Sequence, residues 1–110
     1  MSDAFPYAGD AVLGPLIARA LHRVIDPEMA LDVVELGLVY GVEADGGAVT
    51  VRITMTSAAC PVSEFIADEV AREIRHELGE ATDVRVDLVW DPPWGPERLS
   101  DRARATLDWD

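Results

Sequence analysis

The chain has 110 residues, of which 49% are hydrophobic and 27% are charged, as expected for one globular domain with a single hydrophobic core. Its formal net charge is −12, and all 9 of its basic residues are arginine. Phosphate backbones and anionic lipid headgroups repel so acidic a chain, so the composition argues against nucleic acid and membrane surfaces as partners.

The first expected element is a helix that follows a loose N-terminal arm. Residues 1–13 show no regular hydrophobic pattern, whereas residues 14–110 are predicted to form a single domain. Gly14-Pro15 is typical of a helix start, because proline is well tolerated in the first turn. The helix is expected to end near Ile25, because Asp26 precedes a proline and is driven out of the α-helical region. Between these limits the apolar residues have helical spacing: Leu16, Ile17, Ala20, Leu21 and Val24.

Two strands joined by a tight hairpin are expected next. Leu36 to Glu43 forms the first strand, and Asp45-Gly46-Gly47 is a strong hairpin signal. The partner strand alternates between an apolar face with Val49, Val51, Ile53 and Met55 and a polar face with Thr50, Arg52, Thr54 and Thr56. The apolar face is predicted to belong to the core.

A long helix, a third strand and a short helix follow. The long helix begins at Cys60-Pro61 and ends before Gly79. Its apolar stripe consists of Val62, Phe65, Ile66, Val70, Ile74 and Leu78. Residues 84–90 alternate as a strand, and Ser100 is a good N-cap for a last helix that ends at about Leu107. The order α-β-β-α-β-α predicts a small α+β domain with helices packed on a three-stranded, mostly antiparallel sheet.

Cys60 is the only cysteine, and it lies where a strand is expected to run into the long helix. First-turn N–H groups and the positive end of the helix macrodipole stabilise a thiolate, which is a better nucleophile and metal ligand than a thiol. A free cysteine is also often a small buried hydrophobe. Thr56 and Ser57 before it and Pro61 after it indicate a shaped loop, and the residues alone leave both interpretations open.

The single cysteine also limits the cellular setting and the kind of cofactor. The first residues lack the basic and apolar regions of a secretory signal, and no run of about 18 apolar residues occurs, so a reducing, cytoplasmic setting is expected. Stable iron–sulfur clusters usually take four thiolates, and structural zinc takes several Cys or His. One cysteine excludes a permanent cluster site within a single chain. A labile cluster or iron shared between subunits, or completed by a partner or a small thiol, is compatible with it.

A group of carboxylates follows the first helix. Asp26 and Glu28 flank Pro27, and Asp32 and Glu35 lie beyond them. These residues could act as acid–base groups, as metal ligands or as contacts to a partner. Alternatively, Asp26 caps a turn and the others are solvated. Carboxylates at a helix C-terminus oppose the macrodipole, an arrangement with a local energetic cost.

Aromatic and histidine residues give weaker signals. The segment Trp90-Asp-Pro-Pro-Trp94 could form a recognition platform, or a stiff aromatic plug over the end of a small sheet. His22 and His76 belong to no metal-ligand motif and are predicted to be structural or exposed. No phosphate-binding glycine loop is present.

Four segments closely resemble the SufT/PaaD-like family of iron–sulfur cluster assembly factors, in the family's order and spacing. They are Val24-Ile-Asp-Pro-Glu28, Asp32-Val-Val-Glu-Leu-Gly-Leu-Val-Tyr40, Met55-Thr-Ser-Ala-Ala-Cys-Pro61 and Leu88-Val-Trp-Asp-Pro-Pro-Trp94. The resemblance covers about residues 15–107. Each segment is a weak signal alone, and the four together are highly specific. The family fold, a helix followed by a hairpin, a helix and a strand, agrees with the predicted elements.

The resemblance implies a non-enzymatic role in forming, carrying or delivering iron–sulfur clusters, with client proteins and the assembly machinery as partners. It implies that Cys60 is the reactive cysteine and metal ligand, that Asp26 and Glu28 are the acidic motif and that Thr56 and Ser57 are the hydroxyl pair. The cofactor is then a transient, shared cluster or iron. A site with one thiol favours a homodimer or a thiol-donating partner.

The chain departs from the family pattern in its cysteine loop and at its end. Ser57 stands where many relatives have Thr, and Ala58-Ala59 where many have Pro and Gly, so a different loop shape is expected. PaaD proteins carry C-terminal cysteines in a zinc-ribbon-like tail. The chain ends at Asp110 without them, which favours the short SufT-like branch.

The residues are also compatible with two other functions. In a thiol enzyme, Cys60 would be the nucleophile and a carboxylate or histidine the base, although no histidine lies near it in sequence. In a pure interaction module, the loop from Trp90 to Trp94 would form the contact and Cys60 would be core packing.

Overall fold

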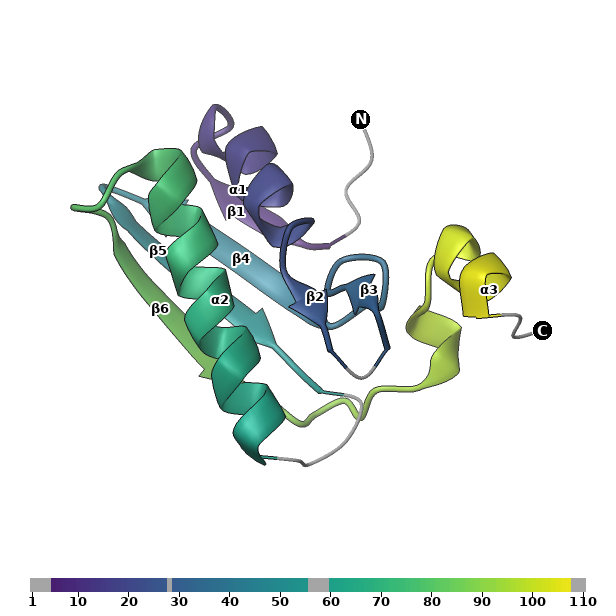
Figure 1. Ribbon diagram of the computed structural model, residues 1–110. Coiled ribbons are helices and arrows are strands. Elements are labelled where there is room, and N and C mark those ends of the chain that lie inside the picture. Colours follow the sequence, from purple (N-terminus) through teal and green to yellow (C-terminus); the bar gives the residue numbers. More distant parts are fainter. Residues whose placement is uncertain (1–4, 28, 56–59, 108–110) are drawn as a thin grey trace.

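The computed structural model describes residues 5–27, 29–55 and 60–107 and contains a four-stranded mixed sheet (Figure 1). The strand order is β1-β4-β5-β6. β4 and β5 form an antiparallel hairpin, whereas β1 lies parallel to β4 and β6 lies parallel to β5. The strands are β1 Tyr7–Gly9, β4 Val39–Asp45, β5 Ala48–Ile53 and β6 Asp83–Leu88.

Two helices lie side by side over one face of the sheet, while a third lies apart from it (Figure 1). They are α1 Leu13–Leu21 and α2 Cys60–Leu78 over the sheet, and α3 Asp101–Leu107 after the 3₁₀ turn Pro96–Arg98. α2 packs against α1 and β6. A small antiparallel ladder, β2 Ile25–Asp26 with β3 Leu31–Asp32, lies between α1 and β4 in the chain. Within the described residues, no helix combines the length and the apolar composition needed to cross a lipid bilayer.

The core forms where the helix stripes meet the apolar face of the hairpin. Val49, Val51 and Ile53 of β5 are buried, which confirms the predicted core face. On α2, the buried residues Ile66, Val70 and Ile74 recur at one-turn spacing, as expected for a helix with one face on a sheet. Phe65 is 48% exposed, so its predicted place in the stripe is wrong. One position along a helix turns a side chain by roughly 100°, which is enough to leave the buried face.

The sheet differs from the predicted one in strand number and direction. Residues 7–9, expected to belong to a loose arm, form β1 and pair with β4. Two of the pairings are parallel, because a helix connects the paired strands in each case: α1 between β1 and β4, and α2 between β5 and β6. Crossover connections of this length return the chain in the same direction. The α+β class holds.

Several element boundaries also differ. α1 ends at Leu21 and β4 begins at Val39, so the described residues 22–27 and 29–38 contain the small ladder and turns rather than more helix and strand. β6 ends at Leu88, two residues before Trp90. The N-cap prediction for the last helix is confirmed, because the Ala103 N–H donates to Ser100 Oγ at 3.0 Å.

Gly37 lies where the turn after β3 closely approaches the C-terminal segment. It has a φ of 73°, in the left-handed region that side chains with a Cβ rarely adopt. A Cβ at this position would overlap the backbone carbonyl of Arg98. Its buried neighbours Leu36 and Leu38 hold the turn in the core. Gly37 is therefore required both by the backbone conformation and by a close approach of two chain segments.

Gly37→Ala is expected to lower the free energy of unfolding by more than about 2–3 kcal/mol, because overlap with Arg98 adds to the roughly 1–2 kcal/mol of left-handed strain. Gly46→Ala is the matched control, since Gly46 also has a positive φ but open space around its Cβ position. Urea unfolding followed by circular dichroism measures both. Equal losses in the two variants would show that the contact with Arg98 adds nothing.

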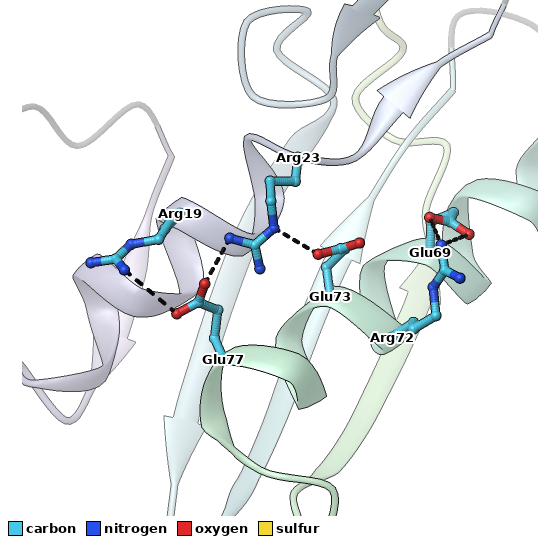
Figure 2. A network of polar contacts seen from close by, with 6 residues as sticks. All are labelled: Arg19, Arg23, Glu69, Arg72, Glu73 and Glu77. Atoms are coloured by element: carbon cyan, nitrogen blue, oxygen red, sulfur yellow. Dashed lines mark hydrogen bonds and ion pairs between the residues drawn. The ribbon is translucent and has the colours of Figure 1, made fainter.

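A network of ion pairs ties the end of α1 to α2 (Figure 2). Arg23, just after α1, reaches between two glutamates of α2: its Nε lies 2.7 Å from Glu73 Oε1, and its Nη1 lies 2.6 Å from Glu77 Oε2. Arg19 lies at 4.0 Å on the other side of Glu77. The hydrogen bond from Arg23 lowers the pKa of Glu77 below its ordinary value of 4.5.

Glu77→Gln is expected to lower the unfolding temperature at pH 7 and to have a smaller effect in acid. A carboxyl whose pKa is depressed in the folded chain stabilises it above its unfolded pKa, and this stabilisation is lost as the pH falls through the folded pKa. The gap between variant and parent should therefore shrink below pH 4.5. Melting curves from pH 7 to pH 3 measure this gap.

Glu69→Gln is the control, because Glu69 pairs with Arg72 within α2 and does not join the two helices. It is expected to change the melting temperature less than Glu77→Gln does. A Glu77→Gln effect that stays constant across this pH range would contradict a stabilising role of the ionised carboxylate.

Candidate functional site

Cys60 is the first residue of α2, so the structure places the only cysteine at the N-terminus of a 19-residue helix. The N–H groups in the first turn of a helix and the macrodipole favour a negative group at such a position. Ser63, in the first turn of the helix, is buried. The helix start is thus a place where a thiolate is electrostatically favoured.

Asp26 is a buried carboxylate in β2, with 1% of its surface exposed. Its Oδ1 accepts a hydrogen bond from the Met29 N–H at 3.3 Å, and its backbone carbonyl accepts one from the Ala30 N–H at 2.8 Å. Ala30 has a φ of 61°, which closes the tight turn. The predicted turn-capping role of Asp26 is therefore present. The same residue lies on β2, which contacts α2.

The other predicted site residues divide into two groups. Glu28, Thr56 and Ser57 lie outside the residues that the structure describes. Asp32 and Glu35 are described. Asp32 pairs with Ile25, so the alternation of the ladder turns it to the opposite face from Asp26. The ladder thus separates two carboxylates that are close in sequence.

The segment from Trp90 to Trp94 runs beside the strand that leads toward Cys60. The Val89 N–H donates to the Ile53 carbonyl at 2.8 Å, which ties the start of the segment to the end of β5. Trp94 packs against the core, and its Nε1–H donates to the Leu36 carbonyl at 2.7 Å. Trp94 is therefore an aromatic plug, as one of the two interpretations predicted. Trp90 remains 48% exposed.

Tyr40 is a supporting residue that the sequence pattern did not single out. Its hydroxyl donates to the Pro92 carbonyl at 2.7 Å, and the guanidinium of Arg98 lies 4.4 Å from its ring centre. Both contacts come from residues more than fifty positions away, so no local pattern could identify them. A tyrosine at a strand position is explained equally well by β-propensity.

Thr54 carries a buried hydroxyl directly before the segment that contains Thr56 and Ser57. It is 0% exposed, although the strand alternation had placed it on the polar face. Its Oγ1 has no hydrogen-bond partner among the described residues. A buried hydroxyl without a partner costs about 1–3 kcal/mol, which makes Thr54 an unusual choice for a purely structural position.

Comparison with protein families places this site in a known context. Residues 16–88 match the family model described as "Iron-sulfur cluster assembly protein". The chain is 41% identical over 92 residues to the Fe-S protein maturation auxiliary factor YitW of Bacillus subtilis, covering 83% of this chain and 89% of that protein. It is 44% identical over 85 residues to the Fe-S protein maturation auxiliary factor SufT of Staphylococcus aureus, covering 76% and 96%.

A longer relative and a crystal structure complete the comparison. The iron-sulfur cluster carrier protein of Mycobacterium tuberculosis is 38% identical over 80 residues, which are 72% of this chain but 21% of that protein. The crystal structure of a domain of unknown function, DUF59, from Bacillus anthracis superposes with a TM-score of 0.82 at 39% identity. That match covers 91% of this chain and 94% of the other.

Thr54→Val is expected to raise the free energy of unfolding by up to about 1 kcal/mol, because it replaces an unpartnered buried hydroxyl by a methyl group of the same shape. Thr50→Val, in β5 and only half-buried, is the matched control and should change the free energy of unfolding by less than about 0.5 kcal/mol. Chemical unfolding measures both. A loss of about 1 kcal/mol or more in Thr54→Val would show that the hydroxyl has a partner in the folded chain.

Proposed function

The chain belongs to the iron–sulfur cluster assembly protein family, and on this premise we propose that it is a maturation factor that helps to form, carry or deliver iron–sulfur clusters to client proteins. The observation that carries the proposal is the level of identity to two relatives named as Fe-S protein maturation auxiliary factors, over most of each chain. The carrier protein that shares this domain supports delivery as part of the role.

In this proposal Cys60 binds the cluster or iron in transit, or the client that receives it. Its place at the start of α2 supports this role, because the helix N-terminus stabilises the thiolate that metal binding requires. Asp26 belongs to the same proposed site, supported by its burial and by the contact between β2 and α2. Glu28, Thr56 and Ser57 complete the proposed site.

The cluster is cargo rather than a resident cofactor, because one cysteine supplies one of the thiolates that a cluster usually needs. The remaining ligands then come from a second copy of the chain, from a partner protein or from a small thiol. Because the chain has a single cysteine, the proposal implies a homodimer or a transient complex with an assembly protein or client. A reducing, cytoplasmic setting keeps the thiol available.

A thiol enzyme is the weaker alternative, and the geometry of α2 argues against its simplest form. His76 lies sixteen residues after Cys60 in the same helix, about 24 Å along its axis at about 1.5 Å per residue. This distance rules out a hydrogen bond between the two side chains. The other histidine, His22, contacts the Asp32 carboxylate, with its Nδ1 at 3.3 Å from Oδ2, so its observed partner is a carboxylate.

A pure interaction module would use exposed apolar side chains and leave Cys60 as packing. Trp90, Leu88 and Phe65 are exposed enough to contact a partner. These contacts are compatible with delivery to a client, so they do not distinguish the two functions. The reactivity of Cys60 does: a thiol that alkylating reagents cannot reach in the folded chain would favour the interaction module.

Cys60→Ser is expected to abolish cluster binding and client maturation. Anaerobic reconstitution with iron, sulfide and a small thiol should give cluster absorbance and protein-bound iron in the parent, and background values in the variant. In a deletion strain, the variant should leave client enzymes with reduced cluster content.

His76→Gln is the control for both assays and should match the parent, because His76 is exposed and far from the helix start. Full cluster content in clients of a strain that carries Cys60→Ser would contradict the role of Cys60. Melting curves check that each variant is folded.

A further inference from the structure

We propose that His22, Asp32 and Glu35 form a binding site for a divalent transition-metal ion, with zinc as the best match. One ligand atom from each residue lies within 4.8 Å of the others. The three residues come from different places in the fold: the C-cap of α1, strand β3 and the turn that follows β3. This site goes beyond the proposed role in cluster maturation and does not involve Cys60.

The backbone around the three residues is held in place by hydrogen bonds and burial. The Val33 N–H donates to the Val24 carbonyl at 3.0 Å, which ties β3 to the segment after α1. The Leu36 N–H donates to the Asp32 carbonyl at 3.1 Å and closes the turn. Val24, Val33 and Leu36 are fully buried. The positions of the three ligand residues are therefore fixed by the core.

Each carboxylate has one oxygen held by a structural hydrogen bond. Asp32 Oδ1 accepts from the Glu35 N–H at 2.8 Å, and its other oxygen, Oδ2, lies 3.3 Å from His22 Nδ1. Glu35 Oε1 accepts a hydrogen bond from the Ser100 hydroxyl, which lies outside the cluster at the N-cap of α3. A ligating carboxylate oriented by an outer hydrogen bond is typical of metal sites in proteins.

The spacing of one ligand pair and the charge of the cluster both suit a metal ion. Bonds of about 2.0–2.1 Å in tetrahedral geometry place neighbouring zinc ligands about 3.3 Å apart. The 3.3 Å between His22 Nδ1 and Asp32 Oδ2 is close to this value. Among the described residues, no arginine forms an ion pair with Asp32 or Glu35, so a metal ion would not have to displace one.

The ligand set selects the class of metal. An imidazole nitrogen with two carboxylate oxygens suits zinc, iron(II) or manganese(II), whereas magnesium and calcium prefer oxygen ligands alone. Three protein ligands leave a fourth position for water or for a group from a partner. Because Glu35 also holds Ser100, a bound ion would connect the end of α1, the β3 turn and α3.

Zinc titration of the Cys60→Ser protein tests the site without interference from the thiol. The full chain, without a histidine tag and treated with chelator, is titrated with zinc and separately with magnesium by calorimetry. We expect one zinc per chain and at least tenfold weaker binding in His22→Gln and in Glu35→Gln. Magnesium should give no binding at the same concentrations. Zinc should also raise the melting temperature of the Cys60→Ser protein, but not that of the two further variants.

His76→Gln in the same background is the matched control and should bind zinc as its parent does. Absence of zinc binding, or binding that both His22→Gln and Glu35→Gln leave unchanged, would overturn the proposal and leave His22 and Asp32 as an ion pair only. Because every protein in this test lacks Cys60, its outcome is independent of whether the chain handles iron–sulfur clusters.

Discussion

Burial of one face of α2 against the sheet is the constraint on which the candidate cluster site depends. Ile66, Val70 and Ile74 remove this face from water, and each side chain of this size contributes about 1.5–3 kcal/mol when fully buried. The same packing sets the position of the helix start, where Cys60 lies. A thiol at the end of a helix anchored along its length is held on a rigid element, which is how proteins position reactive groups accurately.

The region between α1 and β4 positions carboxylate side chains. Its small ladder buries Asp26 on one face and presents Asp32 on the other. The C-terminal segment closes over this region through Trp94 and Ser100, and the close approach at Gly37 leaves no room for a larger residue. Two of the family segments, 32–40 and 88–94, are thus held together by a contact between distant parts of the chain.

The candidate cluster site has one thiol, at the start of the long helix α2. One thiol cannot hold a cluster alone, so a chain built in this way is suited to exchange with other proteins rather than to storage. Asp32, which belongs to the proposed metal site, lies on the face of the ladder opposite to that of Asp26.

The sequence by itself determined the features that depend on local patterns. The alternation from Val49 to Ile53, the helical stripe through Ile66 and Ile74, and the cap at Ser100 were predictable, because each is set by neighbouring residues and their burial. The four family segments identified the function for the same reason: they are short and contiguous.

Only the tertiary structure decided which segments meet. It added β1 to the sheet, made β6 parallel to β5, left Phe65 exposed and brought His22 beside Glu35. Strand direction and partner choice depend on how the chain crosses over the whole sheet, and periodicity carries no information about this. Contacts such as Tyr40 with Pro92 join residues far apart in sequence, and they form because the core leaves those surfaces adjacent.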